Sequence, residues 1–281
     1  MARPWCGAVA IDGALKTTEA RGFVFDVDGT LVHRGPDFRA HPVPGATEVL
    51  NRIRRSGRRL VLFTNGSHVP ADQIARALTE DGLPIADDEV LTPVESAITY
   101  LRRYHAGSPV FLFSTDVIRE RIAAAGIRLT TGDDAEAVLV THANEMDITA
   151  LERAAHAVRG GARLLTASYV PGFAGVNGIV LSRGAMITAA IAKVSGARPR
   201  VVGKPSRAAV GELRTHFRLP TQKLAVIGDD LGVDIGLGRM GDSHTILVRS
   251  GTSGEIDLDH VPARLRPDAV IDDVGDLLDS L

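Results

Sequence analysis

The sequence contains few of the residues that several classes of protein require. Cysteine occurs once in 281 residues, at Cys6, so no internal disulfide can form and a reducing, cytoplasmic location is expected. Aromatic residues make up 4% of the chain and the formal net charge is −2, which argues against a nucleic-acid-binding protein. No apolar run approaches the roughly 18 residues that indicate a transmembrane helix. We therefore expect neither nucleic acid nor membrane as a partner.

The N-terminal segment lacks the features of a targeting signal. Residues 1–20 contain a short apolar run that Asp12 interrupts and no convincing cleavage site, so we interpret them as a loose extension. Lysine is also scarce, because only four of the 32 basic residues are Lys. A lysine within a motif is therefore less expected by chance.

Short apolar runs alternate with amphipathic stretches along most of the chain, which predicts an α/β fold with a parallel sheet and crossover helices. Strands are expected at residues 23–26, 59–64, 110–113, 137–140, 163–166, 200–202, 224–228 and 245–248. Helices are expected at residues 46–55, 71–80, 94–104, 117–125, 148–158, 185–194 and 208–217.

Two segments interrupt this alternation and suggest an inserted domain. Residues 83–92 have the composition of a loop, and residues 169–182 that of a glycine-rich loop or hairpin. We interpret them as the junctions of an α/β domain at residues 85–184. Residues 1–84 and 185–281 would then form a discontinuous core domain.

Two carboxylates follow the first expected strand. Asp26 and Asp28 lie two residues apart before Gly29, which allows the chain to turn sharply. In α/β sheets, ligands bind beyond the carboxyl ends of the strands, where these side chains are expected. Such a pair suits a divalent cation, or a nucleophile with a general acid beside it. A plain Asp-Gly turn is the alternative.

Two further strand ends carry groups that bind anions. Thr64, Asn65 and Gly66 offer a hydroxyl, an amide and a free backbone N–H after the second expected strand. Lys204 follows a later strand and could offset the charge of a phosphate or an aspartate. A turn and a solvated surface lysine are the respective alternatives.

A second acidic group follows the strand at residues 224–228. Asp229, Asp230 and Asp234 would repel one another there unless a cation or a basic group compensates them. Hard oxygen ligands favour Mg²⁺ over Zn²⁺. One of the three could instead serve only as a helix cap.

In chain order, the segments Asp26–Thr30, Thr64–Ser67, Gly203–Ser206 and Gly228–Asp234 resemble the motif set of the haloacid dehalogenase-like (HAD) phosphatase superfamily. The forms of the second and third segments, and the large insert between them, are similar to those of class IIA, the branch of the NagD-like and 4-nitrophenyl phosphatases. The resemblance implies a Rossmann-like HAD core with a C2-type α/β cap at residues 85–184. It covers most of the chain from about residue 21 onward.

The resemblance also implies roles for the motif residues. Asp26 would be the nucleophile that forms an aspartyl-phosphate, and Asp28 the general acid and base. Mg²⁺ would be held by Asp26, the backbone carbonyl of Asp28 and Asp229, with Asp230 or Asp234 behind them. The groups that bind the phosphoryl oxygens would be Thr64, Asn65, Gly66 and Lys204. The implied activity is Mg²⁺-dependent hydrolysis of a small phosphorylated metabolite.

The cap departs from the family pattern where substrate specificity is expected. Members usually carry an Asn-x-Asp segment where this chain has Thr166 to Val170. We therefore take Ser168, Tyr169 and Phe173 as the candidates that contact the leaving alcohol. Nucleotides, glycerol phosphate, phosphoglycolate, pyridoxal phosphate and sugar phosphates all stay open as substrates.

Several alternatives to this interpretation differ in function class. A phospho-signalling receiver module also combines aspartates, Thr and Lys around Mg²⁺, but its acidic pair precedes the phosphorylated Asp. A dehalogenase of the same fold would not need Asp28. An inactive HAD paralogue would be expected to have lost at least one motif. The oligomeric state is open, with a homodimer through the cap as one alternative.

Overall fold

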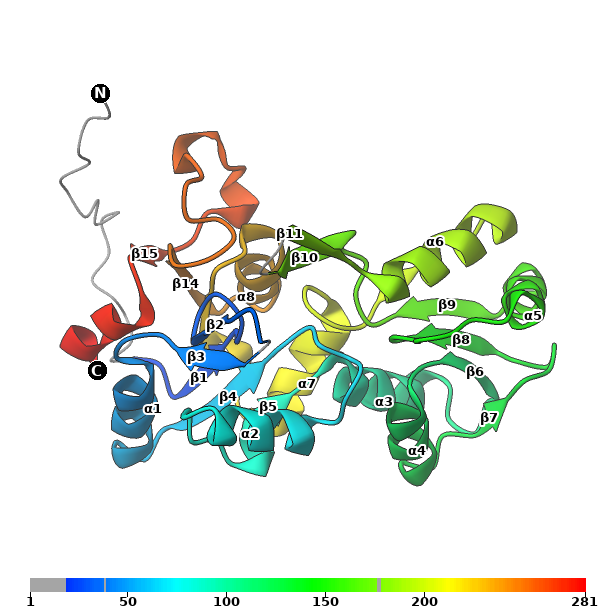
Figure 1. Cartoon of the computed structure of the whole chain (residues 1–281), viewed down its shortest axis with the longest axis horizontal. Helices are drawn as coiled ribbons and strands as arrows, with labels where there is room; N and C mark the ends of the chain where they lie inside the picture. Colours follow the sequence, from blue (N-terminus) through cyan, green and yellow to red (C-terminus); the bar gives the residue numbers. More distant parts are fainter. Residues whose placement is uncertain (1–18, 38, 176–177) are drawn as a thin grey trace.

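The computed structural model describes residues 19–37, 39–175 and 178–281. In these residues the chain forms two parallel β-sheets with helices on both faces, and two antiparallel hairpins (Figure 1). The fold is therefore the α/β class that the sequence predicts. Residues 1–18 of the expected N-terminal extension lie outside the described part of the chain.

The larger sheet has six parallel strands in the order β15-β14-β13-β1-β4-β5. Its strands are β1 (Gly22–Phe25), β4 (Arg59–Phe63), β5 (Val90–Leu91), β13 (Leu224–Gly228), β14 (His244–Val248) and β15 (Ala269–Ile271). The chain leaves β1 towards β4 and leaves β13 in the opposite direction, towards β14. In open α/β sheets such a reversal creates a crevice at the carboxyl ends of the strands, where ligands bind.

Both faces of this sheet are buried. Phe23 and Phe25 of β1 lie in the apolar cluster on the face that carries α1 and α2, and Val24 lies in the cluster on the opposite face, under α7 and α8. Continuous apolar strands are typical of a parallel sheet between two helical layers. The four helices are α1 (Ala46–Arg55), α2 (Ala71–Glu80), α7 (Arg207–Phe217) and α8 (Gly236–Met240).

The smaller sheet has five parallel strands in the order β12-β9-β8-β6-β7. They are β6 (Val110–Phe113), β7 (Leu129–Thr130), β8 (Ala137–Val140), β9 (Arg163–Thr166) and β12 (Arg200–Val201). Helices α3 and α4 cover one face, and α5 and α6 cover the other. Their bounds are α3 (Pro93–Tyr104), α4 (Asp116–Ala124), α5 (Ile148–Arg159) and α6 (Arg183–Ser195).

Two antiparallel hairpins lie outside the sheets. One pairs β2 (Val32–Arg34) with β3 (Ala40–Pro42), and the other pairs β10 (Gly172–Gly175) with β11 (Gly178–Leu181). The second lies in the segment expected as a loop or hairpin and is a hairpin. In the view of Figure 1 it lies between the two sheets, before the start of α6.

All strands and helices predicted from the sequence are present, with ends that differ by a residue or two. The segment 83–92, expected to be a loop, also contains the short strand β5. The division at residues 84/85 and 184/185 stays a prediction. Helix α6, which begins at Arg183 and spans the second boundary, and β12, which follows it, both contact the smaller sheet. Among the described residues, none of the helices has the length and apolar character needed to span a bilayer.

Candidate active site

The candidate residues meet at the carboxyl edge of the larger sheet. Asp26 follows β1, Thr64 follows β4 and Asp229 follows β13. Because β4 and β13 both pair in parallel with β1, these three strand ends point in the same direction. Lys204 comes from the smaller sheet. Val202 extends the pairing of β12 with β9, and Lys204 lies two residues further along the chain.

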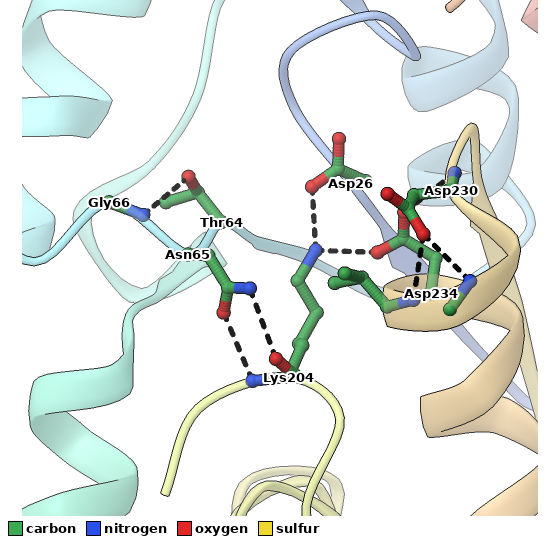
Figure 2. Close-up of polar contacts among 9 residues, drawn as sticks. Asp26, Thr64, Asn65, Gly66, Lys204, Asp230 and Asp234 are labelled. Carbon is green, nitrogen blue, oxygen red and sulfur yellow. Dashed lines mark hydrogen bonds and ion pairs between the residues drawn. The ribbon is translucent and has the colours of Figure 1, made fainter. Parts of the chain in front are cut away.

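Lys204 is the centre of this group. Its side chain is 2% exposed, and its Nζ donates to Asp26 Oδ1 at 2.6 Å and to Asp234 Oδ1 at 2.7 Å (Figure 2). Asn65 fixes the backbone on both sides of this residue: the Lys204 N–H donates to Asn65 Oδ1 at 3.0 Å, and Asn65 Nδ2 donates to the Lys204 carbonyl at 3.1 Å. The amide of Asn65 therefore positions Lys204, which sequence reasoning did not anticipate.

The buried charges change one another's protonation. Burial raises the pKa of Asp26 well above its ordinary value, and Asp234 and Asp229 raise it further, against the opposing effect of Lys204. Burial likewise raises the pKa of Asp234. Burial disfavours the charged form of Lys204, but its contacts with Asp234 and Asp26 outweigh that effect and raise its pKa. Three carboxylates thus share one cation, which leaves negative charge uncompensated.

Three of the carboxylates form a cluster with the chemistry of a metal site. One oxygen from each of Asp26, Asp229 and Asp234 lies within 4.8 Å of the others. Hard oxygen donors of this kind suit Mg²⁺, and a divalent cation would relieve the repulsion among them. The residues present therefore fit the Mg²⁺ that the sequence predicts. Asp234 was expected behind the metal ligands, but its carboxylate belongs to the cluster itself.

The loop after β1 leaves room for the Asp229 carboxylate. Asp229 Oδ2 accepts a hydrogen bond from the Thr252 N–H at 2.6 Å. Gly29 has a φ of 86°, and a Cβ there would lie 2.6 Å from the same oxygen. Glycine is thus required both by the left-handed backbone and by the close approach of the carboxylate.

The side chains of the remaining acidic candidates, Asp28 and Asp230, do not belong to this cluster, although the Asp230 N–H donates to Asp234 Oδ2 at 3.2 Å. The Asp28 side chain is 52% exposed, and its Oδ1 accepts from Arg34 Nε at 2.7 Å. Asp230 caps the π-helical segment Leu231–Ile235, and its Oδ1 accepts from the backbone N–H groups of Gly232 and Val233. The capping role that the sequence left open for one of the three late aspartates is therefore filled by Asp230.

In Figure 2, Thr64 and Gly66 lie on the side of Lys204 opposite to Asp230 and Asp234. Thr64 is buried, and its Oγ1 accepts from the Gly66 N–H at 3.0 Å. The threonine hydroxyl thus holds the turn that presents the backbone of residues 65–67 at the strand end. Such turns place N–H groups where they can bind an anion.

The cap candidates are described only in part. The Ser168 hydroxyl is buried, and no hydrogen-bond partner for it is found among the residues that the structure describes. Tyr169 is 41% exposed. The side chain of Phe173 lies outside the described part of the chain. Val176, three residues further along, lies outside it as well.

The structure also brings together polar residues that sequence reasoning missed. His68 follows the Thr64–Ser67 segment and His142 follows β8, and their ring centroids lie 5.6 Å apart. Arg34 forms an ion pair with Asp28, and the charges of both residues act on His68. Two signals were available in the sequence: His68 lies directly after a motif segment, and the polar positions near Thr141 and His142 depart from the family pattern.

Comparisons with known proteins show the family of this chain. The family model for haloacid dehalogenase-like hydrolases matches residues 23–128, and a second, HAD-hydrolase-like model matches residues 201–277. Ribonucleotide monophosphatase NagD of Escherichia coli is 30% identical over 248 residues, which are 87% of this chain and 93% of NagD. The matched segments contain all four motif segments.

Solved structures share the fold over most of this chain. NagD from E. coli has a TM-score of 0.81 at 28% identity, covering 91% of this chain and 97% of that one. A 4-nitrophenylphosphatase from Thermotoga maritima has a TM-score of 0.82 at 26% identity, with 93% and 97% covered. Glycerol phosphate phosphatase from Mycobacterium tuberculosis, solved with magnesium, has a TM-score of 0.80 at 28% identity, with 91% and 76% covered.

Proposed function

Since this chain belongs to the haloacid dehalogenase-like hydrolases, in the branch of NagD and the 4-nitrophenyl phosphatases, we propose that it is a Mg²⁺-dependent phosphatase of small metabolites. It is a phosphoric monoester hydrolase, and the reaction we propose passes through an aspartyl-phosphate on Asp26. The observation that carries the proposal is the contact of Lys204 with Asp26 and Asp234 beside Asp229, at the carboxyl edge of the sheet.

Lys204 makes Asp26 a competent nucleophile towards an anion. A phosphate monoester repels a carboxylate, so the attack requires positive charge beside both groups. The Nζ of Lys204 lies 2.6 Å from the Asp26 carboxylate and is held there by a buried environment. We propose that it contacts a phosphoryl oxygen while it orients Asp26.

The metal site that we propose uses the carboxylates of Asp26 and Asp229 and the backbone carbonyl of Asp28. Asp234, whose carboxylate belongs to the same cluster, fixes Lys204. When bound, Mg²⁺ would neutralise negative charge on the phosphoryl oxygens and on the carboxylates. The relative from M. tuberculosis was solved with magnesium, which supports this choice of ion.

The proton transfers fall to Asp28. In the first step the Asp26 carboxylate bonds to phosphorus while the bond to the leaving oxygen breaks, and Asp28 gives that oxygen a proton. In the second step Asp28 takes a proton from water, whose oxygen bonds to phosphorus and releases phosphate and Asp26. The exposed position of Asp28 gives it access to both the leaving alcohol and water.

The phosphoryl group would be held from the side opposite to the metal. We propose that Thr64, the backbone N–H groups at residues 65 and 66, and Lys204 bind its oxygens, which requires the Gly66 N–H to leave its hydrogen bond with Thr64 Oγ1. Thr64 and Asn65 also hold the turn and the Lys204 backbone in place. Preorganised donors of this type act mainly through electrostatic stabilisation of the transition state.

The substrate would be a small phosphorylated metabolite whose leaving alcohol faces the inserted segment. We propose that residues 85–184 act as the cap and that Ser168, Tyr169 and Phe173 contribute to specificity. Relatives of this chain are named for different substrates, among them ribonucleotides and D-glycerol 3-phosphate. A cytoplasmic location and a homodimer through the cap stay predictions.

The test is hydrolysis of 4-nitrophenyl phosphate by the purified chain, with added Mg²⁺ and with a chelator. We expect turnover that the chelator abolishes and Mg²⁺ restores. Asp229→Asn should raise the Mg²⁺ concentration needed for half-maximal activity. Asp242→Asn is the matched control, because Asp242 is exposed and an amide tolerates its φ of 54°. Full activity in the chelator, or none under any condition, would contradict the proposal.

A further inference from the structure

Two histidines face each other across the approach to Asp28. His68 comes from the loop after β4 of the larger sheet, and His142 from the loop after β8 of the smaller sheet. Their ring centroids are 5.6 Å apart, with an angle of 49° between the ring planes. The pair therefore joins the two sheets at one point.

The backbones that carry these rings are held in place. Thr115 Oγ1, at the start of α4, donates to the carbonyl of His68 at 2.8 Å. On the other side, a Cβ at Gly184 would lie 2.4 Å from the carbonyl of Thr141, so only glycine lets α6 begin this close to the His142 loop. This approach places Arg183 beside the loop, where its Nη1 donates to Asn144 Oδ1 at 2.9 Å.

The charges around the pair are mainly positive. The charged groups that act on His68 are Arg34 and Asp28, and Arg183 acts on His142. Asp28 already accepts a hydrogen bond from Arg34. Among the described residues, no carboxylate forms an ion pair with Arg183. The surroundings of the two rings thus carry two guanidinium groups and one carboxylate.

Both imidazoles are neutral near pH 7. Partial burial lowers the pKa of His68, and His142 and Arg34 lower it further. Partial burial also lowers the pKa of His142, and Arg183 adds to this effect, although a hydrogen bond with Asn144 opposes it. A neutral imidazole carries one N–H donor, and His142 already has Asn144 as a hydrogen-bond partner, so His68 contributes the ring donor beside the guanidinium groups.

We propose that His68, His142, Arg34 and Arg183 form a second part of the subsite for the leaving alcohol, beside the cap candidates, and that this part selects phosphate monoesters of hydroxy acids. The inference rests on the proposed function, because Asp28 locates the leaving oxygen only if it is the general acid. The N–H group of the His68 imidazole can donate to one oxygen of a carboxylate, and Arg183 supplies the charge that compensates the carboxylate. A neutral polyol would leave Arg183 without a partner of opposite charge.

The test compares two substrates with the same carbon skeleton, phosphoglycerate and glycerol phosphate, which differ by the carboxylate. The purified full-length chain with Mg²⁺ should hydrolyse phosphoglycerate with a kcat/KM about tenfold to a hundredfold higher, as for one or two charge-assisted hydrogen bonds. In Arg183→Gln and His68→Ala this ratio should fall towards one. Arg198→Gln is the matched control, since Arg198 is an exposed arginine shortly after α6, and its ratio should not change.

The possible failures of the two proposals can be told apart. If no ester is hydrolysed, 4-nitrophenyl phosphate included, the proposed function itself is wrong. If both esters are hydrolysed but glycerol phosphate is equal or better, the subsite does not select an anion. If Arg183→Gln lowers kcat/KM by the same factor for both substrates, Arg183 serves the structure of the cap and the inference is also overturned.

Discussion

At the scale of single residues, Lys204 connects the parts of the site. It lies on a loop that arrives from the smaller sheet, and it contacts carboxylates that follow β1 and β13. Such a buried cation compensates Asp26 and Asp234, which would otherwise repel each other. The same ammonium group is the cation nearest to where we propose that phosphate binds.

Replacement of Lys204 by Ala should therefore lower kcat/KM by about a hundredfold to a thousandfold, the range measured when one donor to a developing oxyanion is removed. Steady-state kinetics with 4-nitrophenyl phosphate measure the effect. Lys193→Ala is the control, since Lys193 is exposed on α6, and it should match the wild type. A loss of less than about threefold in Lys204→Ala would mean that the lysine does not stabilise the transition state.

Gly29 provides a second test at this scale. Gly29→Ala combines a strained φ with a Cβ 2.6 Å from Asp229 Oδ2, so it should displace that carboxylate and raise the Mg²⁺ concentration needed for activity. Gly82→Ala is the matched control, because its φ of 95° is also positive but no atom lies within 4 Å of the new Cβ. Equal Mg²⁺ requirements in the two variants would show that the contact with Asp229 is irrelevant.

The residues of the central cluster could be predicted because each follows an apolar strand within a specific motif. Their partners could not all be predicted in this way. His68 and His142 meet only because two sheets bring their loops together, and no spacing in the sequence encodes that contact. The binding of Asn65 to the Lys204 backbone has the same origin.

At the scale of elements, the join between β5 and α3 links the larger sheet to the segment expected as the cap. Thr92 caps α3 and is fully buried: its Oγ1 accepts from the Val94 N–H at 3.1 Å. Glu95 Oε2 accepts from the Thr92 N–H in return, at 3.0 Å, which completes a capping box before the first turn.

Thr92→Ala should lower the free energy of unfolding by about 1–2 kcal/mol, the range for loss of a threonine cap. Urea unfolding followed by circular dichroism measures it. Thr131→Ala in the exposed loop after β7 is the control and should change little. If both variants are equally stable, the capping box does not hold the start of α3.

Most elements of four or more residues were predictable from their apolar pattern, although α8 was not, and of the shortest strands β12 was predicted whereas β5, β7 and β15 were not. β5, β7 and β15 have two or three residues, too few to show a periodicity. They form because neighbouring strands offer an edge to pair with. The hairpin β10–β11 was recognisable as loop or hairpin because glycines bound both of its strands.

At the scale of the whole molecule, the chain order of the motifs and the topology of the larger sheet agree. β1 is central because it pairs with both β4 and β13, so motifs far apart in the sequence meet at one edge. The chain between β5 and α7 supplies the strands of the smaller sheet, and none of these strands pairs with the larger sheet. We therefore expect the covalent reaction to take place at Asp26, which follows this central strand.

The most direct test of this claim is to trap the aspartyl-phosphate. The wild type and Asp28→Asn are mixed with 4-nitrophenyl phosphate and Mg²⁺, quenched in acid within one turnover and reduced with borohydride, which converts an acyl phosphate to an alcohol. Mass spectrometry of the peptide that contains residue 26 then locates the reaction. We predict reduction at Asp26, and more of it in Asp28→Asn because that variant cannot activate water. A burst of 4-nitrophenol with Asp26 unmodified would contradict the account.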